Sequence, residues 1–188
     1  MNFQLVKKEK NLKKNYQIIC RNIKSSIFCY LGFNFFNKMV LNNFIHVYNI
    51  EKNKSIASVI TVIDYKNYKI IKKKIFYHLI KNPFLLIKIF IFLLKSISKN
   101  SNIIINKKYL HLLHLIIFKK KFINISLKRK DLIFNKFYKK ILTNHNSNFL
   151  FLCFEESNHK ANKYYLRNKF KFFYKNRNII YFKKKFKI

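Results

Sequence analysis

The order of hydrophobic and polar residues predicts a folded core in the middle of the chain. Segments 43–50 and 57–63 are rich in β-branched and aromatic residues, which predicts two strands. Asp64 and Asn67 follow directly, and both residue types favour turns. We therefore expect a third strand over 69–76, antiparallel to the second.

The pattern beyond residue 80 predicts helices that alternate with strands. Asn82 and Pro83 are typical of a helix start, and the apolar residues after them predict a helix that ends near Asn100. A short strand is expected at 101–106, a second helix at 107–121 and a last strand at 122–128. The expected fold class is α/β, a mixed sheet with two helices packed on it.

The two ends of the chain lack a clear period of hydrophobic residues. Residues 1–42 are expected to form a basic N-terminal extension, 43–135 the α/β core domain, and 136–188 a basic aromatic C-terminal extension. The final segment, NKFKFFYKNRNIIYFKKKFKI, mixes cations with aromatic rings. Such a segment can place lysines on phosphates and stack its rings on bases, so it favours contact with RNA.

Charge narrows the class of partner. The chain has 41 Lys and Arg but only 6 Asp and Glu, which gives a formal net charge of +35. A protein with this charge repels itself unless it lies against a polyanion. Nucleic acid fits better than an anionic membrane surface, because the charge extends from the first residues to the last.

Composition also argues against several other functions. Six acidic residues are too few for two-metal nuclease chemistry, which needs several converging carboxylates. His111 and His114 are spaced for one helix face, but no cysteine or carboxylate with ligand spacing accompanies them. We expect no catalytic residue, no metal and no cofactor. The apolar run 84–94 is about half the length of a membrane span, so membrane contact is not expected either.

The rarity of certain residues suggests the kind of genome and compartment. One Gly, one Pro and four Arg among the cations indicate strong AT bias, as in organelles or reduced endosymbionts. Three scattered cysteines, Cys20, Cys29 and Cys153, form no regular framework, which favours a reducing compartment. The N-terminal residues have neither a secretory nor an imported-mitochondrial pattern, so synthesis inside an organelle is expected.

A family resemblance rests on the passage FIHVYNIEKNKSIASVITVIDYKNYKI. With His46, Asn53, Ser55, Asp64 and Asn67 at comparable places, it resembles the small-subunit ribosomal protein eleven family. That family also has a helix like the one opening at NPF (82–84) and a phosphate-facing turn where this chain has Lys107 and Lys108. The large-subunit protein eighteen family has a similar layout and is the alternative. The resemblance implies a ribonuclease-H-like layout and no enzymatic activity.

The function expected from charge and resemblance is structural. The chain would be a constituent of the small subunit of an organellar ribosome, in the mitochondrion or else in a plastid-type organelle or reduced endosymbiont. Its partners would be ribosomal RNA and neighbouring ribosomal proteins, with no small-molecule substrate. The alternative is a membrane-associated accessory subunit of an organellar respiratory complex. The residues expected to bind RNA are Lys72, Lys73, Lys74, Lys107, Lys108, Lys119, Lys120, Lys128, Arg129, Lys130, Arg167, Lys171, Arg177, Lys183, Lys184 and Lys185.

Overall fold

The computed structural model describes residues 1–23, 26–85 and 109–187, and its centre is a mixed sheet of seven strands in the order β1-β2-β3-β4-β5-β7-β6. The strands are β1 (Asn2–Leu5), β2 (His46–Lys52), β3 (Ser55–Asp64), β4 (Tyr109–Ile117), β5 (Phe149–Glu155), β6 (Lys171–Asn176) and β7 (Ile179–Lys185). The helices are α1 (Glu9–Asn22), α2 (Ile27–Leu31), α3 (Phe33–Leu41), α4 (Tyr65–Ile80), the short 3₁₀ helix η1 (Lys119–Phe122), α6 (Leu127–Asn144) and α7 (His159–Arg167). Of the paired strands described, β4 and β5 are parallel and the others are antiparallel.

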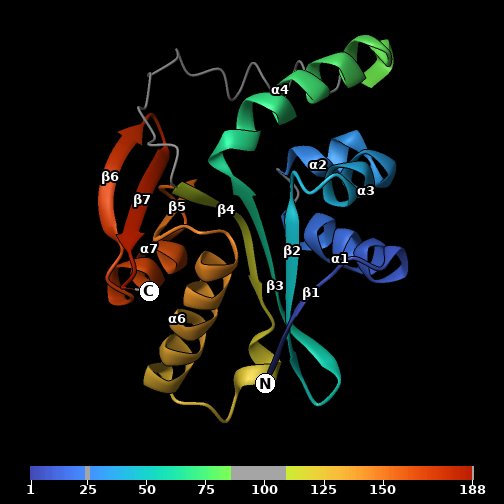
Figure 1. Cartoon of the computed structure of the whole chain (residues 1–188). Helices are drawn as coiled ribbons and strands as arrows, with labels where there is room; N and C mark the ends of the chain where they lie inside the picture. The colour runs from blue at the N-terminus through green and yellow to red at the C-terminus, as the bar shows by residue number, and fades with distance from the viewer. Residues whose placement is uncertain (24–25, 86–108, 188) are drawn as a thin grey trace.

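Helices cover both faces of the sheet (Figure 1). Successive side chains of a strand point to opposite faces, so buried strands supply two cores. On one face Tyr48 and Ile60 lie in a core with Phe134 and Tyr138 of α6. On the other face Val47 and Val59, with residues of α1, α2 and α3, form the second core. Helix α4 starts where β3 ends and projects away from the sheet (Figure 1).

The two helices that follow β4 and β5 have clear local signals. Ser126 caps α6, since its Oγ accepts a hydrogen bond from the Arg129 backbone N–H at 3.3 Å. Asn158 caps α7 in the same way, accepting from Ala161 N–H at 3.1 Å. A buried stripe at helical spacing then holds α6 on the sheet. Its residues are Phe134, Phe137, Tyr138, Ile141 and Leu142.

Sharp turns in this chain rarely use glycine. Gly32, with φ of 85°, separates α2 from α3. Six other described residues also have positive φ, namely Asn43, Asn53, Lys54, Asn146, Lys169 and Arg177. Asparagine tolerates this left-handed conformation, whereas lysine and arginine adopt it against a steric penalty.

The expected α/β class with a mixed sheet is confirmed, and strands 43–50 and 57–63 correspond to β2 and β3. The strand expected at 69–76 is wrong, because these residues lie within α4. The helix expected at 107–121 is also wrong, because Tyr109–Ile117 is β4. Its residues are apolar or His throughout, and a strand covered on both faces shows no alternation of polar and apolar positions.

Other expectations about the layout need correction. Segment 122–128, expected as a strand, contains the end of η1 and the start of α6. The ribonuclease-H-like layout and the basic extensions are not confirmed. Residues 1–42 carry β1 and α1–α3, and residues 136–188 carry the rest of α6 together with β5, α7, β6 and β7. Lysines are so frequent in these segments that the spacing of the inward-packing apolar residues is not apparent from the sequence. Residues 86–106, which include most of the expected helix and strand there, lie outside the described residues.

Two further features bear on the compartment and the membrane. Cys20 of α1 and Cys29 of α2 are joined in a disulfide, which their scattered spacing did not predict. Cys153 is a free, exposed thiol on β5. Across the ranges that the structure describes, none of the helices has both the length and the apolar character needed to cross a bilayer.

Candidate functional site

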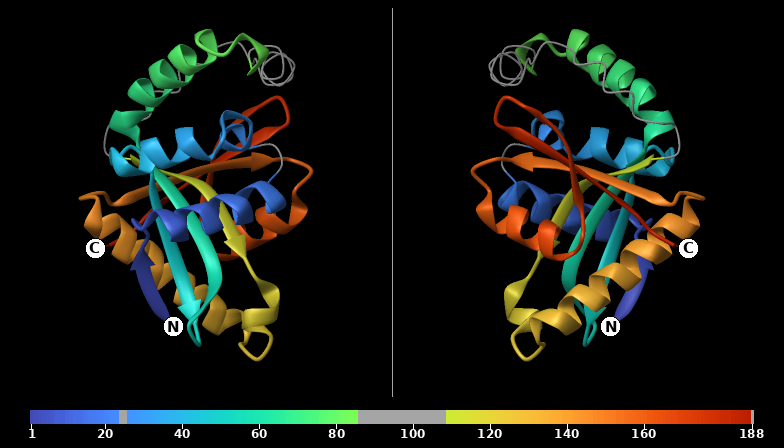
Figure 2. Two further views of the ribbon diagram at one scale, coloured as in Figure 1. Left: turned by 90° about the vertical axis from the view of Figure 1, so that its right-hand side faces the viewer. Right: turned by 90° about the vertical axis from the view of Figure 1, so that its left-hand side faces the viewer.

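The parallel strands β4 and β5 are neighbours over only part of their length. Their register contains four pairs, from Tyr109↔Phe149 to Leu112↔Leu152. Past this point β4 continues beside β3 to Ile117, while β5 continues beside β7 to Glu155. The two strands therefore diverge (Figure 2). We call the mutually unpaired, diverging strand segments Leu113–Ile117 and Cys153–Glu155 the wedge. Diverging strands present backbone N–H and C=O groups that an extended ligand can pair with.

A β-bulge in β4 lies at the closed tip of the wedge. The register between β3 and β4 shifts between Thr61 and Val62, which face His114 and Leu112. Leu113 is therefore an extra residue in β4, immediately beyond the last pair with β5. A bulge bends its strand and redirects the adjacent peptide groups. The pairing of β4 with β5 thus ends at the β-bulge in β4.

A basic segment connects the far end of β4 to α6. Lys119, Lys120 and Lys121 form most of η1, and they are exposed. Lys128 and Arg129 then lie in the exposed first turn of α6. The first turn of a helix directs free backbone N–H groups outward and favours negative charge. Segment 118–126 contains no glycine, so the cationic side chains and not a close backbone loop must provide most of the contact with an anion.

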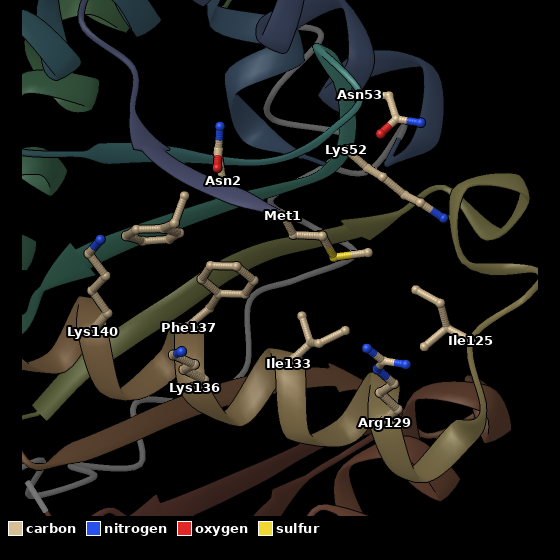
Figure 3. Close-up of a pocket in the computed structure, with 11 residues that line it drawn as sticks. Met1, Asn2, Lys52, Asn53, Ile125, Arg129, Ile133, Lys136, Phe137 and Lys140 are labelled. Carbon is tan, nitrogen blue, oxygen red and sulfur yellow. The ribbon is translucent and has the colours of Figure 1, made fainter.

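Two pockets flank α6, and basic residues from its first turn line both. Arg129 lines a pocket of about 880 Å³ between α6, β1 and the β2–β3 turn, and Lys128 lines another of about 490 Å³ toward α7. Figure 3 shows Arg129, Ile133 and Phe137 on the side of α6 that lines the larger pocket. The residues lining it are Met1, Asn2, Phe3, Lys52, Asn53, Ile125, Arg129, Ile133, Lys136, Phe137 and Lys140. The lining of this pocket contains cationic and apolar groups but no acidic residue. The pocket therefore suits an anionic ligand that has an apolar part.

The smaller pocket contains an internal polar network. Arg167 donates to both carboxylate oxygens of Asp131, from Nε at 2.5 Å and from an Nη at 3.0 Å. Burial alone would raise the pKa of Asp131, but hydrogen bonds from Arg167 and Asn168 lower it overall. Lys184 donates to Asn135 Oδ1 at 2.6 Å and to the Asn168 carbonyl at 2.7 Å. Burial, with nearby cations, lowers the pKa of Lys184 to about 8. Arg167 and Lys184 therefore serve the fold.

Two adjacent tyrosines of α7 have different surroundings. The hydroxyl oxygen of Tyr164 lies 3.3 Å from that of Tyr138, a residue of α6. Tyr165 is 7% exposed and stacks on Phe154 of β5, with ring centroids 5.6 Å apart. Burial raises the pKa of Tyr165 far above its usual value, and neighbouring Tyr164 and Cys153 add to this. Tyr165 therefore packs against β5, the strand on one side of the wedge.

Comparison with solved structures identifies the fold. A structure of the Campylobacter jejuni N-acetyltransferase PseH in complex with acetyl coenzyme A is 15% identical, with a TM-score of 0.56, and the match covers 98% of this chain and 99% of that chain. A mutant of the Vibrio cholerae spermidine N-acetyltransferase SpeG is 11% identical, with a TM-score of 0.58 and coverage of 98% and 95%. A GNAT-family acetyltransferase of Listeria monocytogenes is 14% identical, with a TM-score of 0.51 and coverage of 97% and 94%. No family model and no curated protein matches the chain. At these identities the likeness establishes the fold.

These comparisons overturn the expected resemblance to ribosomal protein eleven. The neighbours are acetyltransferases, and none of the reported ones is a ribosomal protein. The structural role in a ribosome, the absence of enzymatic activity, the ribosomal RNA partner and the absence of a small-molecule substrate were therefore wrong predictions. The passage around His46 and Asp64 misled because helix α4, and not a third strand, follows β3, and β4 is the strand that pairs with β3.

The cations predicted from sequence do not form one surface. Lys119, Lys120, Lys128, Arg129 and Lys130 gather between β4 and α6. The others are placed as follows: Lys72, Lys73 and Lys74 on α4; Arg167 on α7; Lys171 on β6; Arg177 in the turn after it; Lys183, Lys184 and Lys185 on β7; Lys107 and Lys108 outside the described residues. Several contact rings of the protein itself, as Lys183 Nζ does, 4.1 Å from the centre of Phe173.

Tyr165 was not predicted from the sequence. A signal existed in the segment NHKANKYYLRNKF, where an asparagine cap precedes residues at helical spacing. Lys169, at φ of 61°, then ends the helix, and Phe170 N–H donates to the Tyr165 carbonyl at 3.0 Å. Without a glycine after the helix, this end signal was concealed.

Proposed function

We propose that this protein transfers an acetyl group from acetyl coenzyme A to an amine. The observation that carries the proposal is the divergence of β4 and β5 beside the basic start of α6. A molecule with an extended amide-containing arm and a phosphorylated end fits a wedge of strand edges next to a cationic helix start. The likeness to acetyltransferase structures, one of them bound to acetyl coenzyme A, supports the choice of donor.

The chain offers two different kinds of contact to this donor. The backbone edges of Leu113–Ile117 and Cys153–Glu155 can pair with the amides of the pantetheine arm, as a sheet edge pairs with a peptide. Lys128 and Arg129 can bind phosphate oxygens at the start of α6, with the helix dipole adding to the attraction. Lys119 and Lys120 supply further charge where a glycine-rich turn would bring the backbone closer.

The reaction joins the amine nitrogen to the thioester carbonyl carbon and breaks the carbon–sulfur bond. The leaving thiolate must take up a proton, and we assign Tyr165 as its donor. Its ring is fixed between Phe154 and Phe170 at centroid distances of 5.6 and 5.2 Å. The positioned hydroxyl is a general acid, and a proton taken from the amine balances the one given to sulfur.

Net charge bears on the acceptor. A formal charge of +35 repels polycations at long range and draws anions toward the protein. The SpeG structures are named as spermidine N-acetyltransferases, yet a polyamine is a poor match for this surface. We infer that the acceptor carries its amine on a neutral or acidic molecule.

Binding and turnover of three ligands test the donor assignment. The full chain would be titrated with acetyl coenzyme A, with S-acetylpantetheine and with adenosine 3′,5′-bisphosphate at low and high salt. We expect acetyl coenzyme A to bind most tightly, and S-acetylpantetheine to bind with little salt dependence because it lacks phosphates. If net positive charge alone bound the ligand, the bisphosphate would bind as tightly as acetyl coenzyme A. That result, together with no thiol release when neutral or acidic amines are added, would contradict the proposal.

A further inference from the structure

Three metal-ligand side chains meet at the end of the sheet opposite the start of α6. They are His46, the first residue of β2, Asp64, the last residue of β3, and His145, which follows the last residue of α6. Asp64 Oδ2 lies 3.2 Å from His145 Nδ1 and 3.9 Å from His46 Nε2. The three ligand atoms all lie within 4.8 Å of one another. Sequence separation hides this set, since His145 is 81 residues from Asp64.

We propose that His46, Asp64 and His145 form a binding site for a divalent transition-metal ion of the zinc type. Two imidazoles and one carboxylate from three separate elements are a ligand set that Zn²⁺ accepts, with water in the fourth position. This site is separate from the wedge and does not depend on the proposed acetyl transfer. An ion there would join β2, β3 and the end of α6.

The distances between ligand atoms are close to those of a bound ion. Zinc–nitrogen and zinc–oxygen bonds of about 2.0–2.2 Å in a tetrahedron separate neighbouring ligand atoms by about 3.3 Å. The Asp64–His145 distance of 3.2 Å already has this value, and the Asp64–His46 distance of 3.9 Å exceeds it by a fraction of an ångström. We expect the His46 ring to rotate toward a bound ion and to close this gap.

Groups behind the ligands hold both rings in place. His145 Nε2 lies 2.9 Å from the hydroxyl of Tyr48, which is buried. With the Tyr48 hydroxyl accepting the Nε2 proton, Nδ1, which lies 3.2 Å from Asp64 Oδ2, is the atom that would bind the ion. Metal-binding histidines characteristically anchor their second nitrogen in this way. The His46 ring packs edge-on against the His145 ring, with ring centroids 4.4 Å apart.

The ligands are neither sealed from solvent nor fully exposed. The side chains of His46, Asp64 and His145 are 16%, 19% and 6% exposed. An ion can reach the cluster from solvent and keep a water molecule, while the low exposure limits competition from bulk water.

Metal titration of the full chain, without a histidine tag and after chelator treatment, tests the site. We expect one equivalent of Zn²⁺ to bind and to raise the melting temperature. We also expect Co²⁺ to give the strong visible absorption of a tetrahedral site. His46→Asn and Asp64→Asn should abolish that absorption. The matched control, His159→Asn on exposed α7, should leave it unchanged.

A second variant guards against a folding defect. Tyr48→Phe keeps all three ligands and the ring packing, so we expect the Co²⁺ spectrum to persist while affinity falls by about 10- to 100-fold. Circular dichroism would establish that each variant is folded. Absence of Zn²⁺ and Co²⁺ binding by the wild type would overturn the proposal. An unchanged spectrum in folded His46→Asn would also do so, because the ion would then lie elsewhere.

Discussion

The two edges of strand β4 are built in opposite ways. Toward β3 the register runs through seven antiparallel pairs, and side chains seal it. Ser58 Oγ donates to the Ile116 carbonyl at 2.6 Å, and Thr61 Oγ1 lies 2.6 Å from His114 Nδ1. Toward β5 the register contains four parallel pairs and then stops within the described strands. We call the fully paired β3–β4 edge the sealed seam and the partly paired β4–β5 edge the open seam.

The difference between the two seams shows where a rigid fold can hold a ligand. The sealed seam fixes β4 in position, because its hydrogen bonds are internal and its side chains are buried. The open seam can then present backbone groups to a ligand without loss of the sheet's stability. A functional site placed on a firmly held strand keeps its geometry better than one placed on a loop.

Removal of one hydroxyl beside the open seam gives the largest expected effect. For Tyr165→Phe we predict a fall in kcat of roughly 100- to 1,000-fold with little change in the affinity for acetyl coenzyme A, because only the proton donor is lost. Single-turnover thiol release and donor titration would separate the two quantities.

The neighbouring tyrosine provides the matched control for this prediction. Tyr164→Phe removes a hydroxyl that faces Tyr138, so kcat should change by less than about threefold, a shift below one kcal/mol. Equal losses in the two variants would mean that tyrosine hydroxyls of α7 act through packing only.

A buried histidine of the sealed seam predicts acid sensitivity. Burial, with His111 nearby, lowers the pKa of His114 from 6.5 to about 4 in the folded protein. Between these pH values the unfolded chain binds a proton that the folded chain does not. Stability is therefore lost as the pH falls from about 6.5 to about 4, by about 3 kcal/mol from this group.

Denaturant unfolding across this pH range tests the prediction with two variants. His114→Gln should show a weaker loss of unfolding free energy than the wild type. His159→Gln, on the exposed surface of α7, should follow the wild type. Parallel curves for all three proteins would show that the seam is already open to water at His114.

Charge at the start of α6 gives the smallest expected effect. Replacing Lys128 and Arg129 by Ala should weaken acetyl coenzyme A binding by about tenfold and make it less dependent on salt. Surface charge pairs contribute about 1 kcal/mol or less each. The control double variant is Lys171→Ala with Arg177→Ala, on the exposed β6–β7 hairpin. An equal loss in that control would assign the binding to overall charge.

The sequence allowed the antiparallel seam to be predicted in part and the open seam not at all. Segments 43–50 and 57–63 have the β-branched residues typical of strands, so β2 and β3 were found. The segment FLFLCFE is equally apolar, but it follows a lysine-rich helix, and it was assigned to an extension. Parallel pairing of β4 with β5 joins residues about 40 positions apart, which local patterns do not indicate.

Of the candidate site, only the cationic residues could be predicted from the sequence. Lys119, Lys120, Lys128 and Arg129 were four of the sixteen cations expected to bind RNA. His46, Asp64 and His145 come together through the fold, and His145 carried no signal of its own. Neutral side chains that act by position, such as Tyr165, are invisible to an inference that starts from net charge.

The scarcity of glycine has a consequence for evolution and engineering. Lys54, Lys169 and Arg177 hold a left-handed backbone at a penalty of roughly 1 kcal/mol each, within a total stability that for most domains is about 5–15 kcal/mol. Changing a lysine codon to a glycine codon requires two base changes, so a single mutation does not make this substitution. Site-directed mutagenesis makes it directly. Glycine at these three turns should raise the melting temperature of the protein.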